Sequence, residues 1–439
     1  MAHPAAAGLP SCFWRPPHRR APGAPHYPTP APPAPRPAQI PGPKKLKDQC
    51  EEELGDVGGV SDPMSFASPT RAHALEGESG SSAEQASPGG PRAHRATGMG
   101  AATAPGASPT VKTLLRQQLE RVAALNYAFS FLFLGVLSSL VTLYLLFTPF
   151  WFLSVFYFVW FYLDWDTPNR GGRRFNWVRN WTVWKLQKSY FPVKLVKTAE
   201  LPPNQNYVMG VHPHGVMCTG IFCNYVTEST SFSQQFPGIR CTLAGPAGLF
   251  YSPLYRDYVL AMGMCSVSRQ SLDFILSRSQ SGQAVMIVIG GAHEALYSVP
   301  GKHCLVLQQR KGFVRLALRH GAALVPLYSF GENDIFKLKA FERDSWQHLA
   351  QMVCKRLIGF SPGLFWGRSI FLANFWGLLP FPKPITTVVG HPIPVPQCLN
   401  PTEEKVSHYH ALSVKALEQL FEEHEESYGV PASTHLTFI

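Results

Sequence analysis

Two histidines separated by a proline are the residues of this chain best placed to do chemistry. His212-Pro213-His214-Gly215 follows residues 207–211, an apolar run that predicts a buried strand, and loops at strand ends often display reactive groups. Pro213 fixes its own φ and disfavours helical geometry at His212. A neutral imidazole can take a proton from a hydroxyl at physiological pH, so this pair indicates a general base. The alternative is two structural histidines that cap a turn.

Two further motifs also follow apolar runs or open a helix. Residues 287–289 lead through two glycines to Glu294, whose carboxylate could orient a histidine or accept a substrate hydroxyl. Arg310, Lys311 and Arg315 lie at an expected helix start, where free N–H groups also favour anions, so they suit phosphates. A solvated helix end is the alternative for these cations. A third strand, at residues 325–330, ends in the polar pair Glu332 and Asn333.

A membrane segment is predicted before these motifs. Residues 122–163, a run of 42, contain no Asp, Glu, Lys or Arg. One bilayer crossing needs about 20 apolar residues, so the run predicts two crossings or a hairpin that dips into one leaflet. Pro149 is the expected hinge, since proline breaks the helical hydrogen-bond ladder. A buried soluble hairpin would normally show a polar stripe, which this run lacks.

Positive charge flanks this run on both sides. Residues 111–197 carry 11 Lys and Arg against 3 Asp and Glu, and so hold +8 of the net charge of +11. By the positive-inside rule both flanks are expected in the cytosol, which favours a hairpin over a single pass. Such clusters also attract anionic lipid headgroups. Nucleic acid is not an expected partner, because no nucleic-acid-binding motif accompanies the charge.

The remaining sequence divides into a leader and one folded domain. Residues 1–108 are rich in Pro, Gly, Ala and Ser, with 14 prolines in the first 45 residues, and we expect this leader to be disordered. Whether residues 1–98 belong to the native protein stays open, since Met99 could be a start site. Residues 109–165 form the expected membrane hairpin, and residues 166–439 form a cytosolic domain. Nine cysteines, an odd number without metal-like spacing, indicate reduced thiols.

Strands alternate with helices in the last of these regions, which predicts an α/β domain with a central sheet flanked by helices. The expected strands are residues 207–211, 284–289, 324–328 and 386–389, and the clearest helices are residues 271–277, 311–320 and 402–426. Gly321 supplies the expected left-handed stop of the second helix. The aromatic stretch at residues 360–381 could be core or a second membrane-contacting surface.

Six ordered motifs resemble the type-2 diacylglycerol acyltransferase family, which includes the monoacylglycerol acyltransferases. They are Tyr190-Phe191-Pro192, His212–Gly215, Pro237-Gly238-Ile239-Arg240 and residues 290–296, 310–315 and 325–333. Residues 164–168 and 428–434 look most like the type 3 monoacylglycerol acyltransferases. The resemblance covers about residues 110–439.

The resemblance implies a glycerolipid-acyltransferase-like domain in the endoplasmic-reticulum membrane that transfers a fatty acyl group from acyl-CoA to an acylglycerol, with no further cofactor and no metal. The expected catalytic residues are His212, His214 and Glu294, with His212 preferred as the base. Glu294 is the candidate orienting carboxylate because the His-x4-Asp dyad of related enzymes is absent: Met217 and Thr219 stand at the two Asp positions. Arg240, Arg310, Lys311 and Arg315 are expected to bind the acyl-CoA phosphates.

Several alternatives stay open at this point. The acceptor could be monoacylglycerol, diacylglycerol or a wax alcohol, because each presents a hydroxyl to the same base. A metal-dependent hydrolase could use His212, His214, His293 and Glu294 as ligands. A non-catalytic lipid-binding membrane protein could keep the fold without the reaction. The acyl chain preference and a homo-oligomeric state are not fixed by these patterns.

Overall fold

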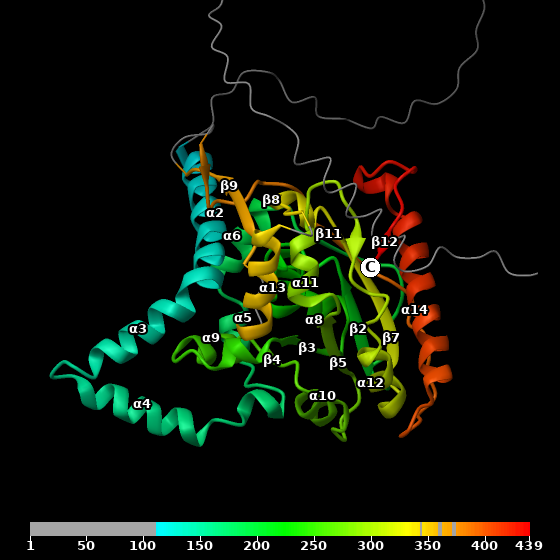
Figure 1. The fold of residues 1–439 in the computed structure, drawn as a ribbon, viewed down its shortest axis with the longest axis horizontal. Coiled ribbons are helices and arrows are strands. Elements are labelled where there is room, and N and C mark those ends of the chain that lie inside the picture. The colour runs from blue at the N-terminus through cyan, green and yellow to red at the C-terminus, as the bar shows by residue number, and fades with distance from the viewer. Residues whose placement is uncertain (1–110, 343–344, 359–361, 371–374) are drawn as a thin grey trace, which may run out of the picture. The chain divides into compact units, whose positions relative to one another are not determined.

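A seven-stranded sheet forms the centre of the domain. The computed structural model describes residues 111–342, 345–358, 362–370 and 375–439, so the predicted leader at residues 1–108 lies outside the described residues. The strand order is β1-β11-β7-β2-β5-β3-β4 (Figure 1). Their bounds are β1 Lys194–Lys197, β2 Tyr207–His212, β3 Arg240–Gly245, β4 Cys265–Ser266, β5 Gln283–Val288, β7 Ala323–Phe330 and β11 Thr386–Val389.

Strand β2 lies in the middle of this sheet and pairs in parallel with both β5 and β7. Strands β3 and β4 continue the parallel part, whereas β11 is antiparallel to β7 and carries β1 at the far edge. All six residues of β2 are buried, as expected for a parallel strand that is covered on both faces. The carboxyl ends of β2, β5 and β7 therefore meet at one edge of the sheet, which we call the carboxyl edge.

Helices cover both faces of the sheet. One face packs against α2 (Val111–Phe129), α6 (Thr182–Tyr190) and the turn η4 (Phe222–Val226). The other packs against α10 (Arg269–Leu276), α12 (Gly312–His320) and α14 (Glu403–Glu422). The other helices and helical turns outside the α3–α4 segment are η2 Ser130–Leu134, η3 Thr167–Arg170, α5 Asn176–Arg179, α7 Thr219–Ile221, α8 Phe232–Gln235, η5 Ala247–Phe250, α9 Tyr255–Ala261, α11 Gly291–Glu294, η6 Ala295–Tyr297, η7 Glu332–Ile335, α13 Trp346–Ile358 and η8 Glu426–Tyr428.

The predicted α/β domain is confirmed, and its elements lie close to the expected positions. Each expected strand and each of the three clearest helices is present within a few residues of its predicted bounds. Gly321 closes α12 in the left-handed region, with φ +61°. The C-terminal part of the domain adds small sheets, formed by β8 (Lys337–Lys339), β9 (Leu364–Arg368) and β10 (Trp376–Gly377), and by β6 (Cys304–Leu305) and β12 (Thr437–Phe438).

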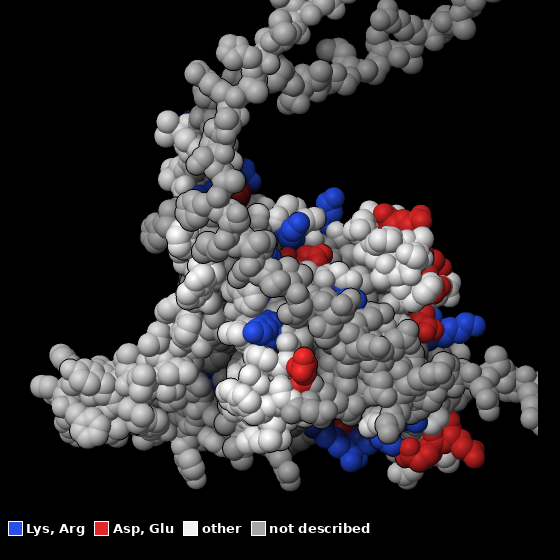
Figure 2. All heavy atoms as spheres, turned by 45° about the horizontal axis from the view of Figure 1, so that its top comes forward, with Lys and Arg blue, Asp and Glu red and all other residues white. Residues whose placement is uncertain are grey.

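The apolar run forms an arm of two helices beside the domain. Helix α2 continues through η2 into α3 (Gly135–Leu145), and α4 (Trp151–Leu163) returns after a turn that contains Pro149, the predicted hinge. One continuous helical stretch, Val111–Leu145, is long and apolar enough to cross a membrane by length and composition. The surface of the α3–α4 arm shows no charged side chain (Figure 2).

The aromatic stretch at residues 360–381 is partly outside the described residues. Among the part that is described, Leu364, Phe375 and Trp376 are exposed, and Trp376 keeps 79% of its surface accessible. Phe365 instead packs against two buried clusters. The stretch therefore contains both of the predicted kinds of residue, core and exposed apolar surface.

Candidate active site

His212 is the last residue of β2 and lies at the carboxyl edge. Side chains alternate along a strand, so His212 shares a sheet face with Val208, which packs among residues of α10, α12 and α14. Tyr328 of β7 lies beside it in register. Only 2% of the surface of His212 is exposed. The strand thus holds this imidazole inside the domain.

The ring of His212 has few polar neighbours. Its Nδ1 atom is buried without a hydrogen-bond partner, and it lies 4.0 Å from Oε2 of Glu294, which is too far for a hydrogen bond. Burial lowers the pKa of His212 to about 3, because a charged imidazolium is costly away from water. His212 is therefore neutral at physiological pH and is a weak base.

His214 is more accessible and better oriented. Its Nδ1 atom lies 2.8 Å from the carbonyl oxygen of Gly215, and a carbonyl oxygen can only accept, so Nδ1 donates and Nε2 keeps its lone pair. Burial lowers the pKa of His214, while the hydrogen bond to Gly215 opposes this shift. The side chain is only partly buried. This geometry gives His214 a free acceptor nitrogen at the carboxyl edge.

Glu294 ends helix α11 and holds the backbone of the histidine motif. Its Oε1 accepts the backbone N–H of His214 at 2.7 Å, and its Oε2 accepts the backbone N–H of Val306 at 2.8 Å. Burial raises the pKa of Glu294 to about 7, although these two hydrogen bonds and the charge of Arg310 pull it down. The structure thus brings His212, His214 and Glu294 together, as predicted, with the carboxylate bonded to a backbone N–H.

Glu332 is a second buried carboxylate at the same edge, and we did not predict it as a site residue. Its oxygens accept the backbone N–H groups of Thr219 at 2.6 Å and Gly220 at 2.8 Å, at the start of α7. A Cβ atom on Gly215, which has φ +62°, would lie 2.5 Å from Cγ of Glu332. Burial raises the pKa of Glu332 to about 7, against the two hydrogen bonds. The signal in the sequence was its position directly after the buried strand β7.

The two glutamates together fix the loop between β2 and α7. Glu294 accepts the backbone N–H of His214. Glu332 accepts those of Thr219 and Gly220, which lie five and six residues further along the loop. Buried carboxylates that accept several backbone N–H groups are expensive to disturb, since each N–H would be left unpaired. The loop that displays His214 is therefore fixed from both sides.

Arg310, one of the four predicted phosphate-binding cations, acts through its charge on Glu294 at this edge. Only two residues separate the end of α12 from the start of β7, and α12 is only about 14 Å long at about 1.5 Å per residue, so it begins part of the way along the sheet. Arg310 and Lys311 immediately precede α12. Arg315 lies one turn further along α12 and is paired with Glu403 at 2.6 Å. Lys311 donates to Ser407 at 2.9 Å.

Arg240 lies at the other end of the sheet. It is the first residue of β3 and pairs with Gln283, whereas Tyr207 at the start of β2 pairs with Ala284. Because these strands are parallel, Arg240 is about 20 Å from the carboxyl edge, at about 3.3 Å per residue. The structure therefore does not bring Arg240 together with His214.

A metal site formed by His212, His214, His293 and Glu294 was an alternative to acyl transfer. Within the described ranges, no group of three or more His, Cys, Asp or Glu side chains is arranged to hold a metal ion, so the metal-hydrolase alternative gains no support. Six described cysteines are free thiols, as expected: Cys218, Cys223, Cys241, Cys265, Cys354 and Cys398. Cys304 is in a disulfide, so the prediction of reduced thiols is wrong for this residue.

Comparison with known protein families identifies the class of this protein as an acyltransferase. A sequence profile described as "Diacylglycerol acyltransferase" matches residues 143–439. The chain therefore belongs to the diacylglycerol acyltransferase family, and the predicted family is confirmed.

Curated relatives agree with this assignment. The chain is 67% identical to human 2-acylglycerol O-acyltransferase 3 over 341 residues, which are 78% of this chain and 100% of the relative. It is 49% identical to bovine diacylglycerol O-acyltransferase 2 over 317 residues, 72% of this chain and 88% of the relative. The predicted likeness to the type 3 enzymes and the predicted enzyme class are confirmed. A crystal structure of the 1-acyl-sn-glycerophosphate acyltransferase PlsC from Thermotoga maritima aligns with a TM-score of 0.33 at 10% identity, covering 71% of this chain and 96% of that one.

Proposed function

We propose that this protein transfers a fatty acyl group from acyl-CoA to the free hydroxyl of 2-monoacylglycerol, with diacylglycerol as a second acceptor. The observation that carries the proposal is the orientation of His214, whose Nδ1 donates to Gly215 and leaves Nε2 as a base at the carboxyl edge. The names of the relatives support the class of acceptor, because they include a 2-acylglycerol and a diacylglycerol O-acyltransferase.

The reaction needs one base and no covalent enzyme intermediate. Nε2 of His214 takes the hydroxyl proton while the glycerol oxygen attacks the thioester carbonyl. The carbon–sulfur bond then breaks, the new ester is released, and the proton passes from His214 to the CoA thiolate. We assign the base to His214 rather than His212, since burial leaves His212 with a pKa of about 3. Glu294 and Glu332 act as positioning residues that hold the loop.

We assign the acyl-CoA phosphates to Arg310, Lys311 and Arg315. Guanidinium groups bind phosphate oxygens through charge-assisted hydrogen bonds, and the free N–H groups at the start of α12 add to the attraction. The charge of Arg310 reaches Glu294, which supports a thioester bound beside His214. Arg240 is left out of this site because of its place at the opposite edge.

The decisive assay measures acyl transfer by the purified full chain. Radiolabelled acyl-CoA is offered with 2-monoacylglycerol, diacylglycerol and a long-chain alcohol in competition, and His214→Ala serves as the inactive control. We expect 2-monoacylglycerol to be used fastest. A purified protein that binds acylglycerol without forming product would instead be a non-catalytic lipid-binding protein, and the proposal would fail.

The arm formed by α3 and α4 is proposed to dip into one leaflet of the endoplasmic-reticulum membrane from the cytosolic side. Within the continuous helix Val111–Leu145, α2 packs against the core of the domain. Only α3 and α4 extend away from the domain, and at about 1.5 Å per residue they span about 16 and 20 Å, less than the ~30 Å hydrocarbon core. Tyr157 in α4 donates to Asp257 of α9 at 2.6 Å, and Asp257 also pairs with Arg173. These polar contacts tie α4 to the folded domain and support a hairpin that returns to its own side.

Epitope tags test this topology. With tags at residue 105 and at the C-terminus, both should be reached by antibody when only the plasma membrane is permeabilised. Protection of either tag until the lumenal membrane is opened would show that the arm crosses the bilayer.

A further inference from the structure

Arg240 and Arg278 both lie at the amino edge of the sheet, where no step of acyl transfer uses them. Arg240 opens β3, and its backbone N–H donates to the carbonyl of Gly282 just before β5. Arg278 lies in the loop that leads into the same strand. Burial lowers the pKa of Arg278, and the neighbouring charge of Arg240 lowers it further. Two guanidinium groups therefore lie close enough to repel each other.

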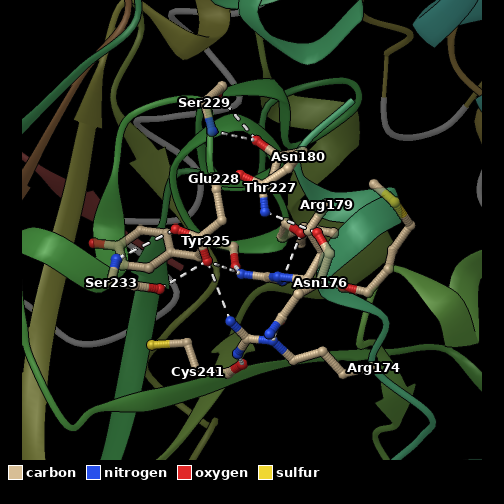
Figure 3. Close-up of polar contacts among 12 residues, drawn as sticks. Arg174, Asn176, Arg179, Asn180, Tyr225, Thr227, Glu228, Ser229, Ser233 and Cys241 are labelled. Atoms are coloured by element: carbon tan, nitrogen blue, oxygen red, sulfur yellow. Dashed lines mark hydrogen bonds and ion pairs between the residues drawn. The ribbon is translucent and has the colours of Figure 1, made fainter. Parts of the chain in front are cut away.

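Arg174 lies beside Cys241, near the start of β3 (Figure 3). Its Nη1 atom donates to the carbonyl of Cys241, the residue after Arg240, at 3.5 Å. Burial lowers the pKa of Arg174 to about 10, and the charges of Arg179 and Arg240 add to this effect while Glu228 opposes it. The charge of Arg240 thus acts on both other guanidinium groups, and we call Arg174, Arg240 and Arg278 the arginine cluster.

Negative charge does not balance this cluster. Glu228 is the one acidic partner drawn with Arg174, at 3.2 Å, and it also pairs with Arg179 at 2.9 Å. Among the described residues, no salt bridge joins Arg240 or Arg278 to an acid. Arg240 is exposed and Arg278 is partly exposed, so both can reach an anion from solvent or from a lipid surface.

Exposed aromatic side chains accompany the cluster, and Arg278 also contacts the segment that follows the membrane arm. Trp177, which is 75% exposed, and Phe175 follow Arg174 in sequence, and Phe274 lies exposed under the guanidinium of Arg278. Nη2 of Arg278 donates to the carbonyl of Arg170 at 3.3 Å, only seven residues after α4 ends. Exposed aromatic rings beside cations are typical of a surface that rests among lipid headgroups.

We propose that Arg174, Arg240 and Arg278 form a binding site for the phosphate of an anionic phospholipid, in the same leaflet that holds the α3–α4 arm. The site is separate from the acyl-transfer site, since it lies at the opposite edge of the sheet. Its role is to seat the domain on an anionic membrane surface and so fix the orientation of the arm.

Lipid binding by the full chain in detergent tests this site without any turnover. The probes are short-chain phosphatidylserine, short-chain phosphatidylcholine, free CoA and inorganic phosphate. Arg240→Gln/Arg278→Gln is compared with Lys194→Gln/Lys415→Gln, a matched loss of two exposed cations on β1 and α14. Unchanged melting temperatures confirm that both variants fold. We expect phosphatidylserine to bind the wild type best, and the arginine variant to bind it about tenfold or more weakly, with the lysine variant unaffected.

Each other outcome overturns the proposal. Weaker CoA binding in the arginine variant, with phosphatidylserine binding intact, would make the cluster a second acyl-CoA contact. Equal effects on inorganic phosphate and phosphatidylserine would show a general small-anion site. Equal losses in both variants would show a non-specific charge effect. Because the readout is binding, failure here leaves the transferase proposal standing, and failure of the transferase assay leaves this one standing.

Discussion

Glu294 accepts the backbone N–H of His214 at 2.7 Å, while its other oxygen stays 4.0 Å from the ring of His212. The carboxylate therefore positions the loop and not the imidazole ring of His214, the proposed base. In the familiar histidine–carboxylate pair the acid fixes the ring itself. Here the carbonyl of Gly215 fixes the ring of His214, and Glu294 fixes the chain that carries it.

Glu294→Gln should lower kcat about tenfold to a hundredfold. The two backbone N–H groups of His214 and Val306 need two acceptor oxygens, and a glutamine offers one oxygen and one NH2 group. One N–H is left unpaired, which costs about 1–3 kcal/mol, and each 1.4 kcal/mol of barrier is about tenfold in rate. Steady-state kinetics should show little change in the KM for acyl-CoA. Glu404→Gln, an exposed change on α14, is the control, and a normal kcat in Glu294→Gln would make this carboxylate dispensable.

His214→Ala should lower kcat/KM by about 10²–10⁴-fold, because it removes the base. In the wild type we expect the acid limb of the pH–rate profile to fall below the ordinary imidazole pKa of about 6.5, since burial lowers the pKa of His214. His212→Ala should lose activity through packing and keep that acid limb. His391→Ala, an exposed change, controls for loss of an imidazole. An acid limb that survives in His214→Ala and vanishes in His212→Ala would move the base to His212.

Arg310→Ala and Arg315→Ala should each raise the KM for acyl-CoA several-fold to about tenfold with little change in kcat. A cation that binds phosphate equally in the ground and transition states contributes to KM alone. Glu403 holds Arg315 at 2.6 Å, so Glu403→Gln should release this cation and lower the same KM. Arg240→Gln should leave it unchanged. An unaltered KM in both alanine variants would place the phosphates elsewhere.

The sequence was sufficient to predict the frame of the site. The buried strand at residues 207–211, the glycines before Glu294 and the Gly321 stop each depend on local patterns, and each lies where expected. Parallel strands bring their carboxyl ends together, so motifs that follow strands were expected to meet. His214 and Glu294 do meet, within a hydrogen bond.

Two features could not be predicted in the same way. Arg240 was grouped with the other cations by its motif, but it begins its strand, and only the register with Gln283 shows that it belongs to the amino edge. Glu332 resembles any polar residue after a strand. Its role depends on two N–H groups from a loop more than 110 residues earlier, and such long-range partners leave no periodic trace in sequence.

Glu332→Gln should change how stability depends on pH. Burial raises the pKa of Glu332 from 4.5 to about 7, so between these values the folded protein holds a proton that the unfolded chain has released. Stability from this group is therefore greatest below about pH 4.5 and is lost as the pH rises toward 7, by up to about 3 kcal/mol. The pKa values of His212 and Glu294 are also shifted. Both residues are present in the wild type and in the variant, so their contributions cancel when the stabilities of the two proteins are compared.

Melting temperatures of wild type and Glu332→Gln in detergent, measured from about pH 5 to about pH 8, isolate this effect. The variant should be less stable throughout, because glutamine cannot accept from both Thr219 and Gly220. The difference in melting temperature between the two proteins should be largest at about pH 5. It should become smaller as the pH rises, since only the wild type has a proton on Glu332 to lose. Glu404→Gln should run parallel to the wild type. A gap that stays constant or widens with rising pH would mean that Glu332 is ionised across this range, and that it holds the loop as a permanent charge.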